Sequence, residues 1–281
     1  IISIFLFAAG ILASAETYTW TGNVNDAWGN NSNWKTALND PAPNFPNNSS
    51  DDVVIPNTTL NPKISNDVSI NSLTINSGGA LTLGTGGTIT LSGDFTNDGT
   101  FTADPGTTVT LSPSGNTVTI TGTSTANNTK FNNLSLTNAG GKTLSINGKI
   151  SVAGSLNLSG TSSSSKLTVQ GSSPSDFNIQ LTSDQIPDSS TKKGYYLDVQ
   201  SSIPISSKTY YIALSSLPAS PPANWKHMSS TWKTTATTTA WNTASNWTPE
   251  AVPTADWPVI IPAGGTNYPV LTGDVSAQSV T

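Results

Sequence analysis

The 281-residue sequence contains no cysteine and only one histidine, His227, and charged residues make up only 10% of it. The absence of cysteine excludes disulfides, thiolate nucleophiles and cysteine-ligated zinc. A single histidine excludes histidine-based metal sites and leaves serine catalysis without a recognisable base. No nucleophile elbow, phosphate-binding loop or dinucleotide fingerprint is present. We therefore expect no catalytic residues, no metal and no cofactor.

Basic residues are also scarce, with 11 Lys and Arg against 16 Asp and Glu and a net charge of −5. Without a basic cluster to neutralise phosphates, a nucleic-acid partner is excluded. Low charge alone is compatible with disorder, but disordered chains also lack aromatic and β-branched residues. This chain has eight tryptophans and regularly spaced Val, Ile and Leu. We expect it to fold.

The N-terminus resembles a secretory signal. Ile1–Leu12 is apolar and uncharged, and Ala13-Ser14-Ala15 before Glu16 fits a small-residue cleavage site. A transmembrane anchor is the alternative, but the apolar run is shorter than the ~20 residues that span a bilayer. We expect residues 1–15 to be a truncated signal peptide. The mature chain would then be secreted, extracellular or at the cell surface, and not membrane-spanning.

A tryptophan-rich stretch occurs twice. Ala27–Trp34 returns as Ala240–Trp247, with tryptophans six positions apart and Ser-Asn before the second one in both copies. Trp20 has a counterpart in Trp232. The following segments also match: Phe45-Pro46 with Val252-Pro253, 53–56 with 259–262, and 62–69 with 269–276. Such repetition dictates architecture. Because the second copy stops at Thr281, the counterpart of Thr74, we expect the chain to be a fragment of a tandem array.

The region between the two copies consists of apolar–hydroxyl–apolar triplets such as Leu73-Thr74-Ile75, separated by Gly, Asn and Ser. This alternation is typical of strands with one buried face. Residues 86–93 align with 106–113 at an offset of 20, and 134–146 align with 156–169 at an offset of 22 to 23. A period of 20-odd residues predicts an all-β parallel β-helix, or β-solenoid. An immunoglobulin-like β-sandwich is the alternative, although it does not require similarity between successive coils.

These patterns predict six segments. They are a signal peptide (1–15), a Trp/Asn/Pro-rich capping module (16–66), solenoid coils (67–171), an irregular β segment (172–217), a Pro-rich linker (218–229), and a truncated second module (230–281).

Several motifs resemble those of large secreted bacterial surface proteins. They are the Trp box ending in Asn33-Trp34, the strand 51–56, the Ser72–Ile75 continuation, and the segments Gly93–Phe101 and Phe131–Gly141. The chain is similar to adhesin-like proteins of the filamentous-haemagglutinin or autotransporter-passenger type over about 18–171 and 232–281. This resemblance implies export, a right-handed parallel β-helix and a role at the cell surface or in the matrix. The resemblance implies no active site.

Three functions remain open. The first is a non-catalytic adhesive stalk or extracellular matrix element whose hydroxyl-rich surface contacts glycans or other surface components. The second is a carbohydrate-binding module that stacks sugars on tryptophan. Its candidate residues are Trp20, Trp28, Trp34, Trp241 and Trp247. Stacking requires an exposed indole face, whereas a capping role requires buried rings.

The third possibility is a β-helix polysaccharide lyase or glycosidase. Glycosidases use two carboxylates in one cleft, and the candidates are Asp94, Asp98 and Asp104 if they line a single groove. Otherwise these residues belong to turns, which suits Asp98-Gly99 and Asp104-Pro105-Gly106. Asp51-Asp52 offers oxygen ligands for calcium, but no calcium-loop motif surrounds it.

Overall fold

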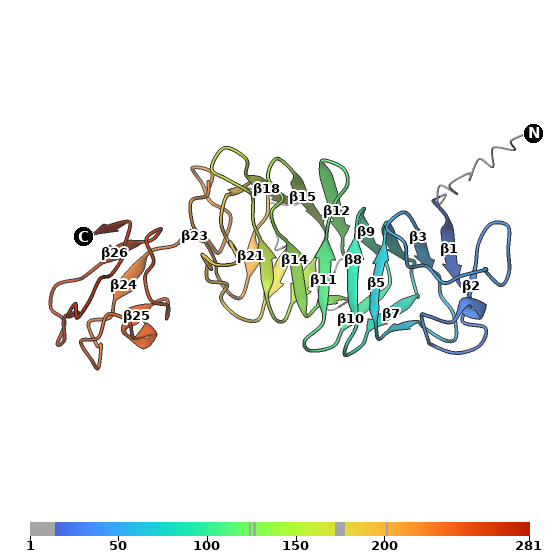
Figure 1. Ribbon diagram of the computed structural model, residues 1–281, viewed down its shortest axis with the longest axis horizontal. Coiled ribbons are helices and arrows are strands. Elements are labelled where there is room, and N and C mark those ends of the chain that lie inside the picture. The colour runs from blue at the N-terminus through green and yellow to red at the C-terminus, as the bar shows by residue number, and fades with distance from the viewer. Residues whose placement is uncertain (1–14, 124, 126–127, 172–177, 201) are drawn as a thin grey trace, which may run out of the picture.

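The computed structural model describes residues 15–123, 125, 128–171, 178–200 and 202–281. It is all-β, and its parallel sheets stack as a β-solenoid of about 10 turns (Figure 1). Residues 1–14 of the expected signal segment 1–15 lie outside the described residues. Within the described ranges, no helix is long and apolar enough to cross a membrane.

Each complete coil contributes one strand to each of three sheets, which we name A, B and C. Sheet A runs in the order β2 (Trp34–Lys35), β1 (Thr17–Trp20), β3 (Asp52–Ile55), β6 (Ser72–Ile75), β9 (Phe95–Asn97), β12 (Thr117–Thr121), β15 (Thr143–Asn147), β18 (Leu167–Gly171) and β20 (Leu197–Val199). Sheet B contains β4 (Lys63–Ile64), β7 (Ala80–Leu83), β10 (Thr100–Ala103), β13 (Thr129–Phe131), β16 (Ile150–Val152), β19 (Ile179–Leu181) and β21 (Ile205–Ser206). Sheet C contains β5 (Asp67–Ile70), β8 (Thr88–Leu91), β11 (Thr108–Leu111), β14 (Asn133–Leu136) and β17 (Leu156–Leu158).

The 20-residue offset found in the sequence is the register of neighbouring coils. β8 pairs with β11 in parallel, placing Ile89 opposite Val109 and Leu91 opposite Leu111. β14 and β17 pair in the same way, with Leu134 opposite Leu156. Parallel pairing between successive coils excludes the β-sandwich alternative, which is built from antiparallel sheets.

One predicted register is wrong by two residues. The sequence alignment placed Ile146 opposite Val169, but β15 and β18 pair with Leu144 opposite Val169 and Ile146 opposite Gly171. A shift of two residues keeps every side chain on the same face of its strand, because the side-chain period of a strand is two. Alternation alone therefore cannot distinguish the two registers.

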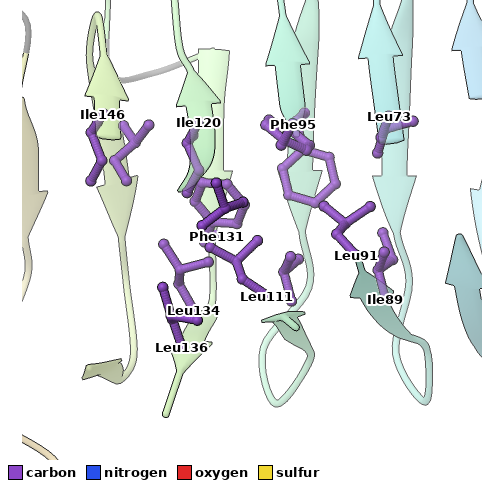
Figure 2. Close-up of a cluster of buried hydrophobic side chains, with 14 of the residues drawn as sticks. Leu73, Ile89, Leu91, Phe95, Leu111, Ile120, Phe131, Leu134, Leu136 and Ile146 are labelled. Atoms are coloured by element: carbon purple, nitrogen blue, oxygen red, sulfur yellow. The ribbon is translucent and has the colours of Figure 1, made fainter. Parts of the chain in front are cut away.

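The apolar residues of the triplets fill the interior. Leu73, Ile75, Ile89 and Leu91 are fully buried, while the hydroxyl residues between them are partly exposed. Figure 2 shows Leu73, Ile89 and Leu91 among the apolar side chains that follow one another from coil to coil. Burying a side chain of this size contributes about 1.5–3 kcal/mol. Because every coil repeats the pattern, the core is continuous along the solenoid.

Two polar or aromatic features interrupt the aliphatic core. Phe95, Phe101 and Phe131 form a cluster with ring centroids 5.2–5.4 Å apart. Asn97 is fully buried, and its Nδ2 donates to the carbonyl of Asn128 and to Oγ1 of Thr129, both at 2.8 Å. Its Oδ1 accepts from Gly99. This amide is satisfied on both sides, which offsets the cost of burying it.

The coils extend beyond the predicted range 67–171. They begin with β3 at Asp52, inside the predicted capping module, and continue through the predicted irregular segment to β20 and β21. The predicted linker contains β23 (Trp225–His227), which pairs in parallel with β22 (Tyr210–Ile212). Trp225 is buried against the ring of Tyr210, so this part of the linker belongs to the fold. His227 is exposed.

Sheet C ends at β17, where two buried side chains replace the next strand. The amide of Leu156 donates to Oε1 of Gln185 at 3.0 Å, and its carbonyl accepts from the Tyr210 hydroxyl at 3.0 Å. An unpaired strand edge would otherwise leave backbone groups unsatisfied. The large residues that break the sequence rhythm after Gly171 therefore close this face.

Candidate functional site

The N-terminal module is organised around Trp34. This fully buried ring lies edge-on to Trp20 and Trp28, with centroid distances of 4.9 and 4.6 Å, and Tyr18 adds a third edge contact at 6.5 Å. Edge-to-face geometry is favourable for aromatic pairs beyond the area they bury. The rings form one aromatic cluster at the start of the solenoid core.

Local hydrogen bonds explain the six-residue spacing of the tryptophans. Nε1 of Trp34 donates to the carbonyl of Trp28 at 2.7 Å. The short 3₁₀ helix η1 (Asn31–Asn33) reverses the chain between them, and the buried Asn33 donates from Nδ2 to the carbonyl of Ala27 at 3.0 Å. The Ser-Asn-Trp sequence is kept because Asn and Trp both tie down the same loop.

The second copy repeats this geometry. Trp247 lies 4.9 Å from Trp232 and 4.8 Å from Trp241, and its Nε1 donates to the carbonyl of Trp241 at 2.8 Å. Asn246 donates to the carbonyl of Ala240 at 3.0 Å, as Asn33 does to Ala27. The strands β25 (Trp247–Thr248), β24 (Ser230–Trp232), β26 (Pro258–Ile260) and β27 (Ser279–Val280) are arranged as β2, β1, β3 and β6 are in the first copy.

The module closes the first coil of the solenoid. β1 pairs in parallel with β3, and β2 pairs antiparallel with β1 at the edge of sheet A. The two-residue β2 leaves little open strand edge, which is how proteins avoid edge-to-edge association. The Trp28 loop reaches sheet B through a parallel bridge between Ala27 and Lys63.

All five tryptophans considered for sugar stacking are buried. Their exposed fractions are 1% for Trp20, 3% for Trp28, 0% for Trp34, 5% for Trp241 and 0% for Trp247. A stacking platform needs an open indole face, so this burial favours the capping role for these side chains.

The three aspartates considered for catalysis lie at three different corners of one coil. Asp94 precedes β9 of sheet A, Asp98 lies between β9 and β10, and Asp104 follows β10 of sheet B. Two of them bond neighbouring coils, since Asp94 accepts from the Thr119 amide at 2.7 Å and Asp104 from the Thr85 amide at 3.2 Å. They do not line one groove, which is the arrangement that a carboxylate pair requires.

Asp51 and Asp52 are engaged with separate protein donors. Asp51 is nearly buried and accepts from the amides of Asn47 and Asn48 at 3.2 and 3.0 Å. Burial raises its pKa above the ordinary value, although these two hydrogen bonds oppose the shift. Asp52 accepts from Nδ2 of Asn71 at 2.9 Å and from the Ser72 hydroxyl. No group of three or more metal-binding side chains occurs within the described residues.

A pocket of about 390 Å³ lies beside the first Trp box. It is bounded by the 26–29 loop, by residues 63–68, which comprise β4, the following turn and the start of β5, and by Phe45 and Asn47. Neither Phe45 nor Lys63 stands out in the sequence as a candidate site residue. Phe45 is 36% exposed, and such partial exposure of a large ring cannot be read from the sequence alone.

The fold defines this chain as a β-solenoid repeat protein with a duplicated tryptophan cap. No protein-family model matches it, and neither the curated proteins nor the solved structures include a significant match.

Proposed function

We propose that this chain is a non-catalytic segment of an exported bacterial surface protein that serves as an adhesive stalk or extracellular matrix element. The observation that carries the proposal is the continuous core running through stacked coils from Trp20 to Trp225. Because each coil contacts only its neighbours, a solenoid gains length without losing stability. The resemblance to adhesin-like β-helix proteins points in the same direction.

The contact between the first solenoid and the second module also suits a stalk. Tyr195 and Ala213 from the last coils pack with Met228 and with Trp257 of the second module in one buried apolar cluster. Burial and the nearby Asp256 raise the pKa of Tyr195 to about 12. A packed junction resists bending more than an extended linker does, so successive units would act as one rod.

The surface chemistry supports weak contact with glycans or other surface components. The hydroxyl residues of the triplets repeat along the sheets, and the chain carries few charges. Repeated weak contacts raise avidity without a strong individual site.

Surface labelling tests the proposal. We expect antibodies raised against residues 16–281 to label intact source cells or their matrix, and external protease to remove the signal. A cytoplasmic antigen that becomes accessible only after lysis would overturn it. The purified chain incubated with insoluble polysaccharides should release no sugar, and the appearance of oligosaccharide in the supernatant would favour the lyase or glycosidase alternative.

A further inference from the structure

Both tryptophan modules contain a pocket at the same place. In the first, the Lys63 amide donates to the Asp26 carbonyl at 2.7 Å, and the pocket lies beside this contact. In the second, the Val270 amide donates to the Thr239 carbonyl at 2.7 Å, beside a pocket of about 420 Å³. Both volumes are within the range of small-ligand pockets. The module therefore builds a concave surface next to its cap each time it occurs.

The first pocket combines an open aromatic ring with unpaired polar groups. Phe45 is 36% exposed, in contrast to the buried Trp28 ring on the same lining. Among the described residues, neither the Asp26 carboxylate nor the Lys63 ammonium has an ion-pair or hydrogen-bond partner. Asp67 uses one carboxylate oxygen to accept from Thr88.

Asn47 contributes a further donor to this lining. Its Oδ1 accepts from the Ser69 amide at 2.9 Å, which fixes the side chain, while its Nδ2 has no protein partner among the described residues. An apolar face with a few convergent polar groups is the usual composition of a ligand site.

The lining of the second pocket lacks the exposed ring and the charged groups, although Asp67 recurs in the sequence as Asp274. Thr239 replaces Asp26 and Val270 replaces Lys63, and the counterpart of Phe45 is Val252, which does not line the pocket. The first pocket therefore has an exposed ring and charged groups, whereas the second has the same position, a buried Trp241 ring and no charged lining residue.

We propose that the first pocket binds one saccharide unit of a surface or matrix glycan. The carbon-bound hydrogens of a pyranose face pack on the Phe45 ring, its hydroxyls donate to Asp26 and Asp67, and the Lys63 ammonium and Asn47 amide donate to its oxygens. This binding site rests on the proposed adhesive role and would be the place where the chain contacts a glycan. The buried tryptophans shape the pocket wall without stacking on the sugar.

Titration calorimetry on the 281-residue chain, with cellohexaose, chitohexaose and maltohexaose as separate probes, tests this site. We expect at least one probe to bind with one site per chain. Phe45→Ala should weaken that binding about tenfold or more, while Phe45→Tyr keeps the ring and the affinity. Asp26→Asn should weaken it less. Val252→Ala is the matched control in the second copy and should leave binding unchanged, and thermal melts establish that all variants fold.

Two results would overturn the site. One is binding that is unaffected by Phe45→Ala, and the other is the absence of binding by all three probes. Neither result would contradict the stalk proposal, because the surface-labelling experiment that tests it does not depend on this pocket. Two equivalent binding sites per chain would also contradict the proposal, because the second pocket lacks the groups that it requires.

Discussion

Replacing Trp34 by alanine should loosen the N-terminal end of the solenoid and leave its centre intact. The ring is fully buried between Trp20 and Trp28, and removing a buried tryptophan costs about 3–5 kcal/mol. That is a large share of the 5–15 kcal/mol by which domains are typically stable. Trp34→Phe keeps a ring but loses the 2.7 Å bond to the Trp28 carbonyl, which should cost about 1–3 kcal/mol.

The effect should be local, since each coil contacts only its neighbours. Hydrogen exchange followed by mass spectrometry is the suitable assay, because a single unfolding midpoint is poorly defined for a repeat array. In Trp34→Ala we expect faster exchange over 17–75 and unchanged exchange over 143–158. Ile146→Ala, at a fully buried position in β15, is the matched control and should show the reverse pattern.

Unchanged exchange over 17–75 in Trp34→Ala would refute the capping role. If the same variant instead lost glycan binding while remaining fully protected, Trp34 would have to act on a ligand directly, contrary to its complete burial.

Three further predictions follow from the packing. Because all eight tryptophans are at most 5% exposed, acrylamide should quench their fluorescence weakly, and strong quenching in the native state would indicate an open indole face. Gly99→Ala should cost about 1–3 kcal/mol in urea unfolding, since a Cβ there would overlap the backbone oxygens of Gly79 and Asn76, whereas Gly29→Ala, in open space, should be tolerated. Burial raises the pKa of Asp51, so the folded state binds this proton more tightly than the unfolded chain, and stability falls as pH rises from 3.8 through the folded pKa. Asp51→Asn should remove that fall in a pH series of unfolding measurements, and an unaltered slope would contradict the assignment.

The fold could be predicted from the sequence because every coil of the solenoid repeats the same short apolar–hydroxyl–apolar pattern. Triplets such as Leu73-Thr74-Ile75 set the buried face, and the 20-residue offset sets the pairing of β8 with β11. The register predicted between β15 and β18 was wrong, because a longer connection between these coils allowed a shift of two residues without changing the buried face. The closure of β17 by Gln185 and Tyr210 was not predictable, because side chains there replace a strand.

The candidate site was harder to predict. Tryptophan is the residue most noticeable in the repeat, yet its rings form the cap, whereas the open ring in the pocket belongs to Phe45. The six-residue spacing of Trp28 and Trp34 follows from the hydrogen bond between the Trp34 indole and the Trp28 carbonyl. The spacing is visible in the sequence, but this structural reason for it is not.

The two copies of the module share the residues of the Trp box and differ in the exposed residues of the pocket. The Trp box of the cap is kept, since Asn33 and Trp34 recur as Asn246 and Trp247 with the same hydrogen bonds, whereas Tyr18 is replaced by Ser230. The pocket wall keeps Trp28 as Trp241, but Asp26, Lys63 and the exposed ring of Phe45 have no counterpart among the residues that line the second pocket. Packing alone would not require a charged lining in one copy and permit an uncharged one in the other. Retention of the Trp box together with divergence of the exposed pocket groups is the pattern expected if the cap serves stability in both copies and ligand contact falls to the first.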